Sequence, residues 1–212
     1  MGRGGQEHLA AALLGLLGDS PEFFVARGNT RLDIVVLALR PAATVAIRAG
    51  IPLAVIEARA DMKGGRDLQK DIPLVTVEDF REAGAIAFGT PTRFGNVSSQ
   101  LKNQIDQLTS LWLKGELEGK PAGVFVSTGS LHGGQETTIL TLMAPLLHLG
   151  MILVGVPYSV QELFTTQGGG SPYGPGHVAG DDNRREIDRQ EATICRALGR
   201  RLAEVGLRLG KQ

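Results

Sequence analysis

The chain has 212 residues, 42% of them hydrophobic, and its 22 Lys and Arg residues balance 22 Asp and Glu residues, so the formal net charge is zero. This length fits one α/β domain with a sizeable core, and the charge balance argues against the broad basic surface that binding to nucleic acid or anionic lipid requires. A single cysteine, Cys195, excludes an internal disulfide, as expected of a reducing compartment such as the cytoplasm. No apolar run approaches the roughly 20 residues of a membrane span.

The chain begins with a short apolar run over residues 9–17 (LAAALLGLL). Its length is compatible with the core of a signal peptide, but Glu7 and His8 occupy the place of the basic segment that precedes such a core. We therefore interpret the run as an extra helix. Residues 1–30 are predicted to be an N-terminal extension, and residues 31–208 a single α/β domain.

Five apolar runs have the length and the β-branched content of strands buried in a parallel sheet. These runs span residues 32–39, 51–56, 84–89, 122–126 and 151–156. Three segments between and after them repeat apolar residues at helical spacing. These segments span residues 98–112, 135–149 and 186–207, and the cluster at 181–183 offers N-cap residues for the last helix.

Strands that alternate with helices of this length predict a parallel sheet covered by helices on both faces. Five strands fit a doubly wound, flavodoxin-like sheet with the strand order 2-1-3-4-5, in which ligands bind beyond the carboxyl ends of the strands. Residues 166–180 are rich in Gly and Pro and are predicted to be one long structured loop. Such a loop in a compact domain is usually functional.

Two polar segments follow the third and fourth predicted strands, at residues 89–96 (GTPTRFGN) and 127–136 (STGSLHGGQE). Both combine glycines, whose backbone N–H groups can approach a ligand closely, with hydroxyl side chains and a charged or planar group. Such a set suits a flat heterocycle with polar edges. Because both segments lie at the same edge of the predicted sheet, they predict a ligand site. Ordinary turns between strand and helix are the alternative.

These motifs, together with the helix that ends in LW and the later GGGSPYG, resemble the family of tryptophan-repressor-binding protein A. Members of that family are FMN-dependent NAD(P)H:quinone oxidoreductases with a flavodoxin-like fold. The resemblance runs from about Thr76 to about Leu207, which is most of a single domain. It implies a cytoplasmic enzyme that takes electrons from NAD(P)H and reduces quinones by two electrons. It also implies a homotetramer, in which the Gly- and Pro-rich loop approaches a neighbouring subunit's flavin site.

The resemblance implies two sets of FMN-binding residues, one that wraps the isoalloxazine ring system and one that holds its other edge. The first set is Thr92, Arg93, Phe94, Gly95, Asn96 and Val97, and the second set is Ser127, Thr128, Gly129, Ser130, Leu131 and His132. Within the first set, Arg93 is expected near the pyrimidine edge of the flavin, and a surface ion pair is the alternative for it.

Trp112 matches the family's tryptophan near the substrate, where a large flat side chain can form one wall of a quinone pocket. It also continues the apolar face of the helix predicted over 98–112, so a core position is the alternative. In family members the histidine nearest the flavin matches position 149, which is Leu here. That side-chain role is therefore either lost or passed to His148, and of the two interpretations of His148 we favour a core histidine.

No catalytic side chain follows from the sequence. His and Cys are not clustered at the spacing of a metal site, and Cys195 lies inside a predicted helix, where we expect it to pack rather than react. The G-x-S-x-G motif of serine hydrolases is absent. The redox chemistry that the resemblance implies would come from the cofactor, and the protein would bind and orient it.

The N-terminal third departs from the family. A phosphate is well held by a helix N-terminus with glycine and hydroxyl groups, but residues 40–44 (RPAAT) contain no glycine, and Pro41 lacks an N–H donor. In the family a long helix follows this loop, but only residues 45–50 lie between it and the strand predicted over 51–56, which is too short for that helix. Either residues 6–18 supply that helix out of order, or this third is a shifted reading of the gene. The alternative function is therefore a non-enzymatic flavodoxin-like module that has weakened or lost FMN binding.

Overall fold

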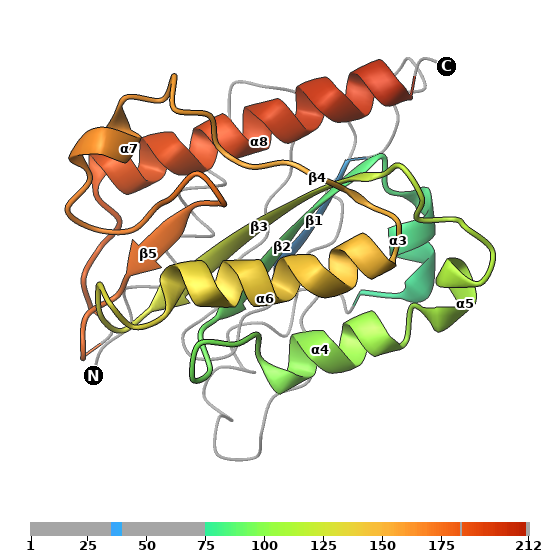
Figure 1. The fold of residues 1–212 in the computed structure, drawn as a ribbon, viewed down its shortest axis with the longest axis horizontal. Helices are drawn as coiled ribbons and strands as arrows, with labels where there is room; N and C mark the ends of the chain where they lie inside the picture. Colours follow the sequence, from blue (N-terminus) through green and yellow to red (C-terminus); the bar gives the residue numbers. More distant parts are fainter. Residues whose placement is uncertain (1–34, 40–74, 183, 211–212) are drawn as a thin grey trace.

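The computed structural model describes residues 35–39, 75–182 and 184–210, and in this part of the chain helices cover a five-stranded sheet (Figure 1). The strands are β1 (Val35–Leu39), β2 (Ala85–Pro91), β3 (Pro121–Thr128), β4 (Ile152–Leu153) and β5 (Gly176–Val178). The helices are α3 (Val77–Glu82), α4 (Ser99–Asp106), α5 (Thr109–Trp112), α6 (Gln135–His148), α7 (Glu162–Thr165) and α8 (Arg189–Leu209). The predicted extension over 1–30 and the predicted strand over 51–56 lie outside the described residues.

The two central strands, β2 and β3, are parallel and pair from Ile86 opposite Ala122 to Pro91 opposite Ser127. Every residue of both strands is buried, as expected of strands that are covered on both faces. The far edge of β3 is shared by two segments, because β4 pairs with its first two residues and β5 pairs with its last three.

β1 runs antiparallel to β2, with Val35 opposite Gly89 and Leu39 opposite Ala85. The prediction of an all-parallel sheet is therefore wrong for this strand. An apolar run does not encode the direction of a strand, and antiparallel edge strands occur on sheets that are otherwise parallel. The order 2-1-3-4-5 is not confirmed, since the described order is β1-β2-β3-β4 with β5 beside β3.

Alternating side chains of the central strands face two separate helical layers, which Figure 1 shows on opposite sides of the sheet. Ile86 and Phe88 pack in one core cluster with α3, α4, α5 and α6. Ala85 and Ala87 pack in a second cluster against α8. α8 lies close to the sheet because Gly123 has no side chain, since a Cβ there would lie 2.8 Å from Leu202. The prediction of helices on both faces is confirmed.

The helices differ from their predicted bounds mainly at the ends. The segment predicted as one helix over 98–112 forms two, α4 and α5, and Pro145 lies inside α6. α8 begins later than the cluster at 181–183 suggested. Its N-cap is Asp188, whose carboxylate accepts from the backbone of Glu191 while the Glu191 carboxylate accepts from the Asp188 N–H. This capping box satisfies amides of the first turn.

The glycine-rich loop (residues 166–180) is not a surface loop throughout, because it contains β5. Its glycines allow close backbone packing. A Cβ on Gly174 would lie 2.1 Å from the Val124 carbonyl oxygen, and one on Gly169 would lie 2.2 Å from the backbone of Gly176. Within the part of the chain that the structure describes, no helix is long and apolar enough to cross a membrane.

Candidate functional site

The β2 loop (residues 92–97) opens with a tight turn at the carboxyl end of β2. The Arg93 N–H donates to the Asn96 carbonyl at 2.8 Å, and the Asn96 N–H donates back to the Arg93 carbonyl at 3.1 Å. Phe94 and Gly95 between them have φ angles of 54° and 76°, as the type I′ turn requires. A phenylalanine seldom takes a positive φ, and this one points its whole side chain into solvent.

Threonine side chains fasten the β2 loop to its surroundings. The Thr92 N–H donates to the Ser127 carbonyl at 2.9 Å and so continues the pairing of β2 with β3. The Thr92 hydroxyl lies 2.8 Å from the Thr138 hydroxyl of α6 and accepts from the Gly95 N–H. The turn is therefore held by both neighbouring elements, β3 and α6.

The β3 loop (residues 129–134) follows the two buried residues that end β3, Ser127 and Thr128. The Thr128 hydroxyl donates to the Ser130 carbonyl at 2.8 Å, which bends the loop at its start. The loop ends at Gly134, whose φ of 92° forms the N-cap of α6 without a side-chain cap. Gly129, Ser130, Leu131 and His132 are exposed.

The β2 and β3 loops touch each other at two glycines. A Cβ on Gly134 would lie 3.0 Å from the Cα of Gly95, and a Cβ on Gly95 would lie 3.2 Å from the Thr137 hydroxyl. Both glycines also have a positive φ, which side chains disfavour. The structure thus brings the two predicted sets of residues together at the carboxyl ends of β2 and β3.

Ser127 has the one buried side-chain polar atom without a hydrogen-bond partner among the described residues, its Oγ. Leaving a hydroxyl buried and unpaired costs about 1–3 kcal/mol, so such a group indicates a missing partner. Ser127 is the last residue but one of β3, and the β3 loop begins after Thr128.

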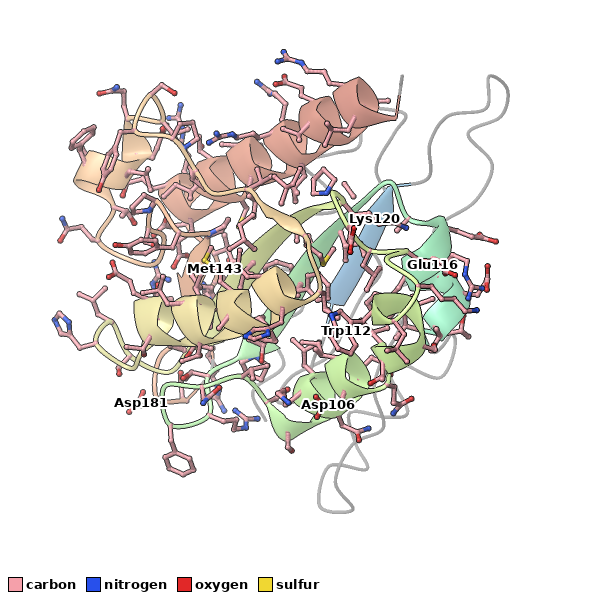
Figure 2. The ribbon with its side chains drawn as sticks, turned by 45° about the vertical axis from the view of Figure 1, so that its right-hand side comes forward. Asp106, Trp112, Glu116, Lys120, Met143 and Asp181 are labelled. Atoms are coloured by element: carbon pink, nitrogen blue, oxygen red, sulfur yellow. The ribbon has the colours of Figure 1, made fainter. Side chains whose placement is uncertain are left out.

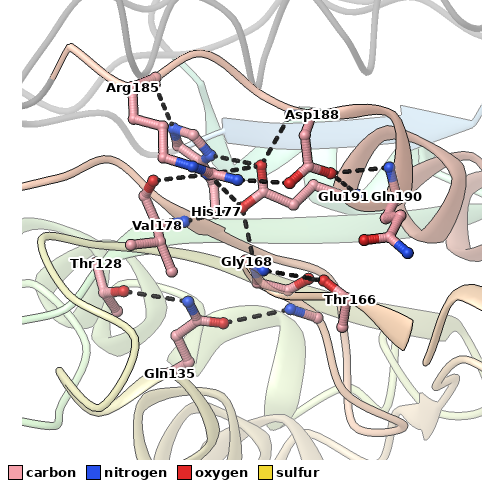
Figure 3. A network of polar contacts seen from close by, with 12 residues as sticks. Thr128, Gln135, Thr166, Gly168, His177, Val178, Arg185, Asp188, Gln190 and Glu191 are labelled. Atoms are coloured by element: carbon pink, nitrogen blue, oxygen red, sulfur yellow. Dashed lines mark hydrogen bonds and ion pairs between the residues drawn. The ribbon is translucent and has the colours of Figure 1, made fainter. Parts of the chain in front are cut away.

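Sequence reasoning missed two buried residues behind the loops, Gln135 and Glu191, which Figure 3 shows with their partners. Gln135 Nε2 donates to the Thr128 hydroxyl at 3.2 Å, and Gln135 Oε1 accepts from the Gly170 N–H at 3.3 Å. Gln135 was part of a recognised motif, but its side-chain partners are distant in sequence. The spacing of Asp188 and Glu191 did carry a signal, because it is that of a capping box.

Glu191 is fully buried and lies at the centre of a charged cluster. Its carboxylate is 3.1 Å from His177 Nδ1 and accepts from Arg185 Nη1 at 2.9 Å. It also accepts from the N–H groups of Gly169 and Val178. Burial alone would raise the pKa of Glu191, but the hydrogen bonds from His177 and Arg185 outweigh it and lower that pKa to about 2.

Trp112 lies apart from both loops within one chain. It ends α5, and the chain then leads to Pro121, where β3 begins, so the length of β3 separates Trp112 from the β3 loop. Eight strand residues span roughly 25 Å. Figure 2 shows Trp112 well away from Asp181, which follows β5. Its side chain is 52% exposed, so the alternative core position is wrong.

The structure also places three other side chains for which the sequence made predictions, those of Arg93, His148 and Cys195. Arg93 Nη1 donates to the Thr92 carbonyl at 2.8 Å, so its guanidinium folds back beside the β2 loop. His148 is exposed at the end of α6, which corrects the expectation of a core histidine. Cys195 is a buried residue of α8 that packs in the core, and burial raises the pKa of its thiol. No group of three His, Cys, Asp or Glu residues in the described ranges could hold a metal ion.

Comparison with known proteins gives concordant matches. The family model described as NADPH-dependent FMN reductase matches residues 44–165. The chain is 50% identical over 149 residues to an NAD(P)H dehydrogenase (quinone) of Trichlorobacter lovleyi, covering 69% of this chain and 73% of that relative. It is 42% identical over 174 residues to an NAD(P)H dehydrogenase (quinone) of Solidesulfovibrio magneticus, covering 80% and 85%.

Two further proteins are similar. The chain is 46% identical over 175 residues to NAD(P)H dehydrogenase (quinone) 3 of Rhizobium meliloti, covering 80% of this chain and 82% of that relative. Among solved structures, a flavodoxin, WrbA-like protein from Agrobacterium tumefaciens is 24% identical with a TM-score of 0.49, covering 62% of this chain and 71% of its own.

Proposed function

Because the chain belongs to the NADPH-dependent FMN reductase family, we propose that it binds FMN and reduces quinones by two electrons with NAD(P)H. The family expected from the sequence motifs is confirmed by these comparisons. The names of the three relatives indicate a nicotinamide and a quinone as the two substrates. The chemistry that FMN supplies when bound is to take two electrons from a nicotinamide and pass them to a quinone.

The single observation that carries the proposal is the unpaired Ser127 Oγ near the carboxyl end of β3, the end of the sheet at which Gly95 and Gly134 touch. A flat ring with polar edges needs hydrogen-bond donors and acceptors that are not already paired within the protein. It also needs backbone that it can approach closely, which glycine provides. We propose that the β2 loop lies against the isoalloxazine. Ser127 and the N–H groups of the β3 loop would bind its polar edge.

The residues proposed to contact FMN are those of the two sets predicted from the sequence: Thr92, Arg93, Phe94, Gly95, Asn96 and Val97, with Ser127, Thr128, Gly129, Ser130, Leu131 and His132. Thr92 and Thr128 act through the backbone that they fasten. Phe94, which solvent surrounds in this structure, has an apolar face with which it could shield the ring from water. None of these residues has to exchange a proton for the reaction to proceed.

We propose that the chain acts as a homotetramer in the cytoplasm. Trp112 is exposed and lies far from the loops of its own chain, so it can line a quinone site only where a second copy brings it there. The zero net charge gives no repulsion between copies. Light scattering at micromolar concentration should give four times the mass of the chain. A monomer would contradict the assembly and remove Trp112 from the substrate site.

The absorption spectrum of the purified protein tests the main proposal. Bound FMN should give a yellow protein with close to one flavin for each chain after reconstitution. Without oxygen, the loaded protein should oxidise more than one equivalent of NADH or NADPH only when a quinone is present, with one quinone reduced for each nicotinamide. A colourless protein that takes up no FMN would instead support the non-enzymatic module.

A further inference from the structure

The conformation of the β3 loop depends on residues that lie far from it in the sequence. The Thr128 hydroxyl bonds to the Ser130 carbonyl inside the loop and accepts from the amide of Gln135. The oxygen of that amide accepts from the N–H of Gly170 in the glycine-rich loop. The buried Gln135 side chain therefore joins the β3 loop to the glycine-rich loop (Figure 3).

The glycine-rich loop is in turn held by Glu191 of α8. The N–H of Gly169, the neighbour of Gly170, donates to Glu191 Oε1 at 2.9 Å, and the N–H of Val178 in β5 donates to the same oxygen at 3.1 Å. One carboxylate thus fixes the glycine-rich loop at two places, at Gly169 before β5 and at Val178, the last residue of β5. Hydrogen bonds to a buried charged acceptor are stronger than those between neutral groups.

β5 completes the connection, because it pairs with the last residues of β3. His177 lies opposite Ser127, and the Ala179 N–H donates to the Thr128 carbonyl at 2.7 Å. Little space is left for adjustment, since a Cβ on Gly176 would lie 2.1 Å from Gln135 Oε1. A shift of β5 would therefore move both Gln135 and the end of β3.

The charged groups around Glu191 come from several segments. The charged groups are Arg185, from the segment before α8, and Asp188, the N-cap of α8, and the imidazole of His177 in β5 is a further hydrogen-bond partner. Arg185 also donates to the Val178 carbonyl at 2.9 Å and to Asp188 Oδ2 at 2.5 Å. Removing the charge of Glu191 leaves His177 and Arg185 without their shared carboxylate, and this favours opening of the glycine-rich loop.

We propose that Gln135 and Glu191 are positioning residues, which hold the β3 loop in the conformation that receives the flavin although Glu191 need not touch the flavin itself. The polar network of Thr128, Gln135, Gly170, Gly169 and Glu191 carries this effect from α8 to the cofactor site. The proposal rests on the proposed function for its ligand. The coupling inside the protein can be measured without any ligand.

The experiment compares three variants in the full chain. Glu191→Gln keeps the size of the side chain and removes its charge. Gln135→Met keeps the size and removes both polar atoms. Leu202→Ala is the control, because Leu202 is a buried residue of α8 that packs in the core and belongs to no part of the polar network. It destabilises the fold by loss of packing alone.

The first measurement is amide hydrogen exchange in the flavin-free protein. We expect Gln135→Met and Glu191→Gln to speed exchange in peptides that cover residues 128–134 by about tenfold relative to Leu202→Ala. Exchange in those peptides that matches the control in both variants overturns the inference, whether or not the protein binds flavin. If Glu191→Gln does not fold, Gln135→Met alone decides the outcome.

The second measurement is FMN binding by quenching of flavin fluorescence, with the reduction potential of the bound flavin. We expect a dissociation constant raised about tenfold in both network variants and unchanged in Leu202→Ala, with a shifted potential only in the network variants. Equal affinity and potential in all folded variants overturn the inference and leave the proposed function intact. Absence of FMN binding in the wild-type protein overturns the proposed function, and hydrogen exchange then still decides the positioning role.

Discussion

Ser127 shows how one side chain can indicate a ligand. Its backbone is fully used, since it pairs with Pro91 in β2 and with His177 in β5. Its Oγ, by contrast, is buried without a partner. Natural proteins rarely bury such groups without a reason. A buried hydroxyl without a partner lowers the stability of the flavin-free protein, and the proposed function predicts that bound FMN supplies the partner.

The Ser127→Ala substitution should separate these two effects. We expect the free energy of unfolding of the flavin-free protein to rise by about 1 kcal/mol, because an unpaired buried hydroxyl is removed. The FMN dissociation constant should rise about five- to tenfold, because a hydrogen bond is lost. Urea denaturation and flavin fluorescence measure the two quantities. Thr193→Ala, which removes a hydroxyl bonded to the Arg189 carbonyl on α8, should leave FMN affinity unchanged. A Ser127→Ala variant with normal FMN affinity would place this hydroxyl outside the site.

Arg93 is the first residue of the tight turn in the β2 loop, and it carries a positive charge. Its guanidinium donates to the Thr92 carbonyl, which keeps it beside the loop. A positive charge near the flavin stabilises the negative charge that reduction brings, so it should raise the reduction potential.

Arg93→Ala should therefore make the potential of the bound flavin more negative and slow its reduction by NAD(P)H, with the fold intact. Spectroelectrochemistry and stopped-flow absorbance measure these changes. Arg93→Lys retains the charge and should recover most of the potential. An unchanged potential at full FMN occupancy would assign Arg93 to the protein surface.

At the scale of elements, the connection between α8 and β5 decides how the site end of β3 is built. The glycine-rich loop supplies a strand, and Glu191 of the α8 capping box fixes it through the Gly169 and Val178 N–H groups. The same carboxylate therefore caps a helix and anchors a strand. Its pKa is held at about 2 by His177 and Arg185 despite burial.

Acid should release this connection. A carboxylate whose pKa is lower in the folded protein than in the unfolded chain stabilises the fold fully above the unfolded value, near 4.5, and loses that contribution as the pH falls to about 2. The contribution of Glu191 amounts to about 3 kcal/mol. Urea unfolding of wild type between pH 6 and pH 2 should show this decline. Glu191→Gln should be less stable at pH 6 and should have a shallower pH dependence, and equal slopes in the two proteins would contradict the assignment.

At the scale of the whole molecule, only one half of the proposed cofactor site lies in the described residues. The β2 and β3 loops form the part that we assign to the isoalloxazine. The segment expected to hold the phosphate, residues 40–44, lies outside the described residues, and its sequence has no glycine and includes Pro41. Arg40 and Thr44 carry side-chain donors for a phosphate, but a backbone without glycine and with Pro41 is poorly suited to wrap a phosphate dianion, so we expect weak binding.

The protein should therefore prefer FMN over riboflavin only modestly, by about tenfold or less, because the phosphate contributes little. Titration of the flavin-free protein with each flavin, followed by fluorescence quenching, measures the ratio. Varying the salt concentration provides a check, since a strong phosphate contact would weaken with salt. A preference for FMN of several orders of magnitude would show that another segment holds the phosphate.

Local patterns in the sequence determined the family, the central strands, the main helices and the two loops of the candidate site. Buried β-strands, amphipathic helices and short loop motifs are written in neighbouring residues, so they can be recognised without a fold. The loops over 92–97 and 127–132 could be brought together by one rule, that the carboxyl ends of parallel strands meet at one edge of the sheet.

Only the tertiary structure decided the direction of β1, the presence of β5 in the glycine-rich loop, the position of Trp112 and the partners of Gln135 and Glu191. Each of these depends on a contact between segments far apart in the chain. Gln135, for example, bonds to Gly170, and Glu191 bonds to Gly169. A short strand of three residues carries almost no periodic signal, and a buried polar residue looks like a surface one until its partners are placed. Long-range pairing is set by how the layers pack, which local patterns do not encode.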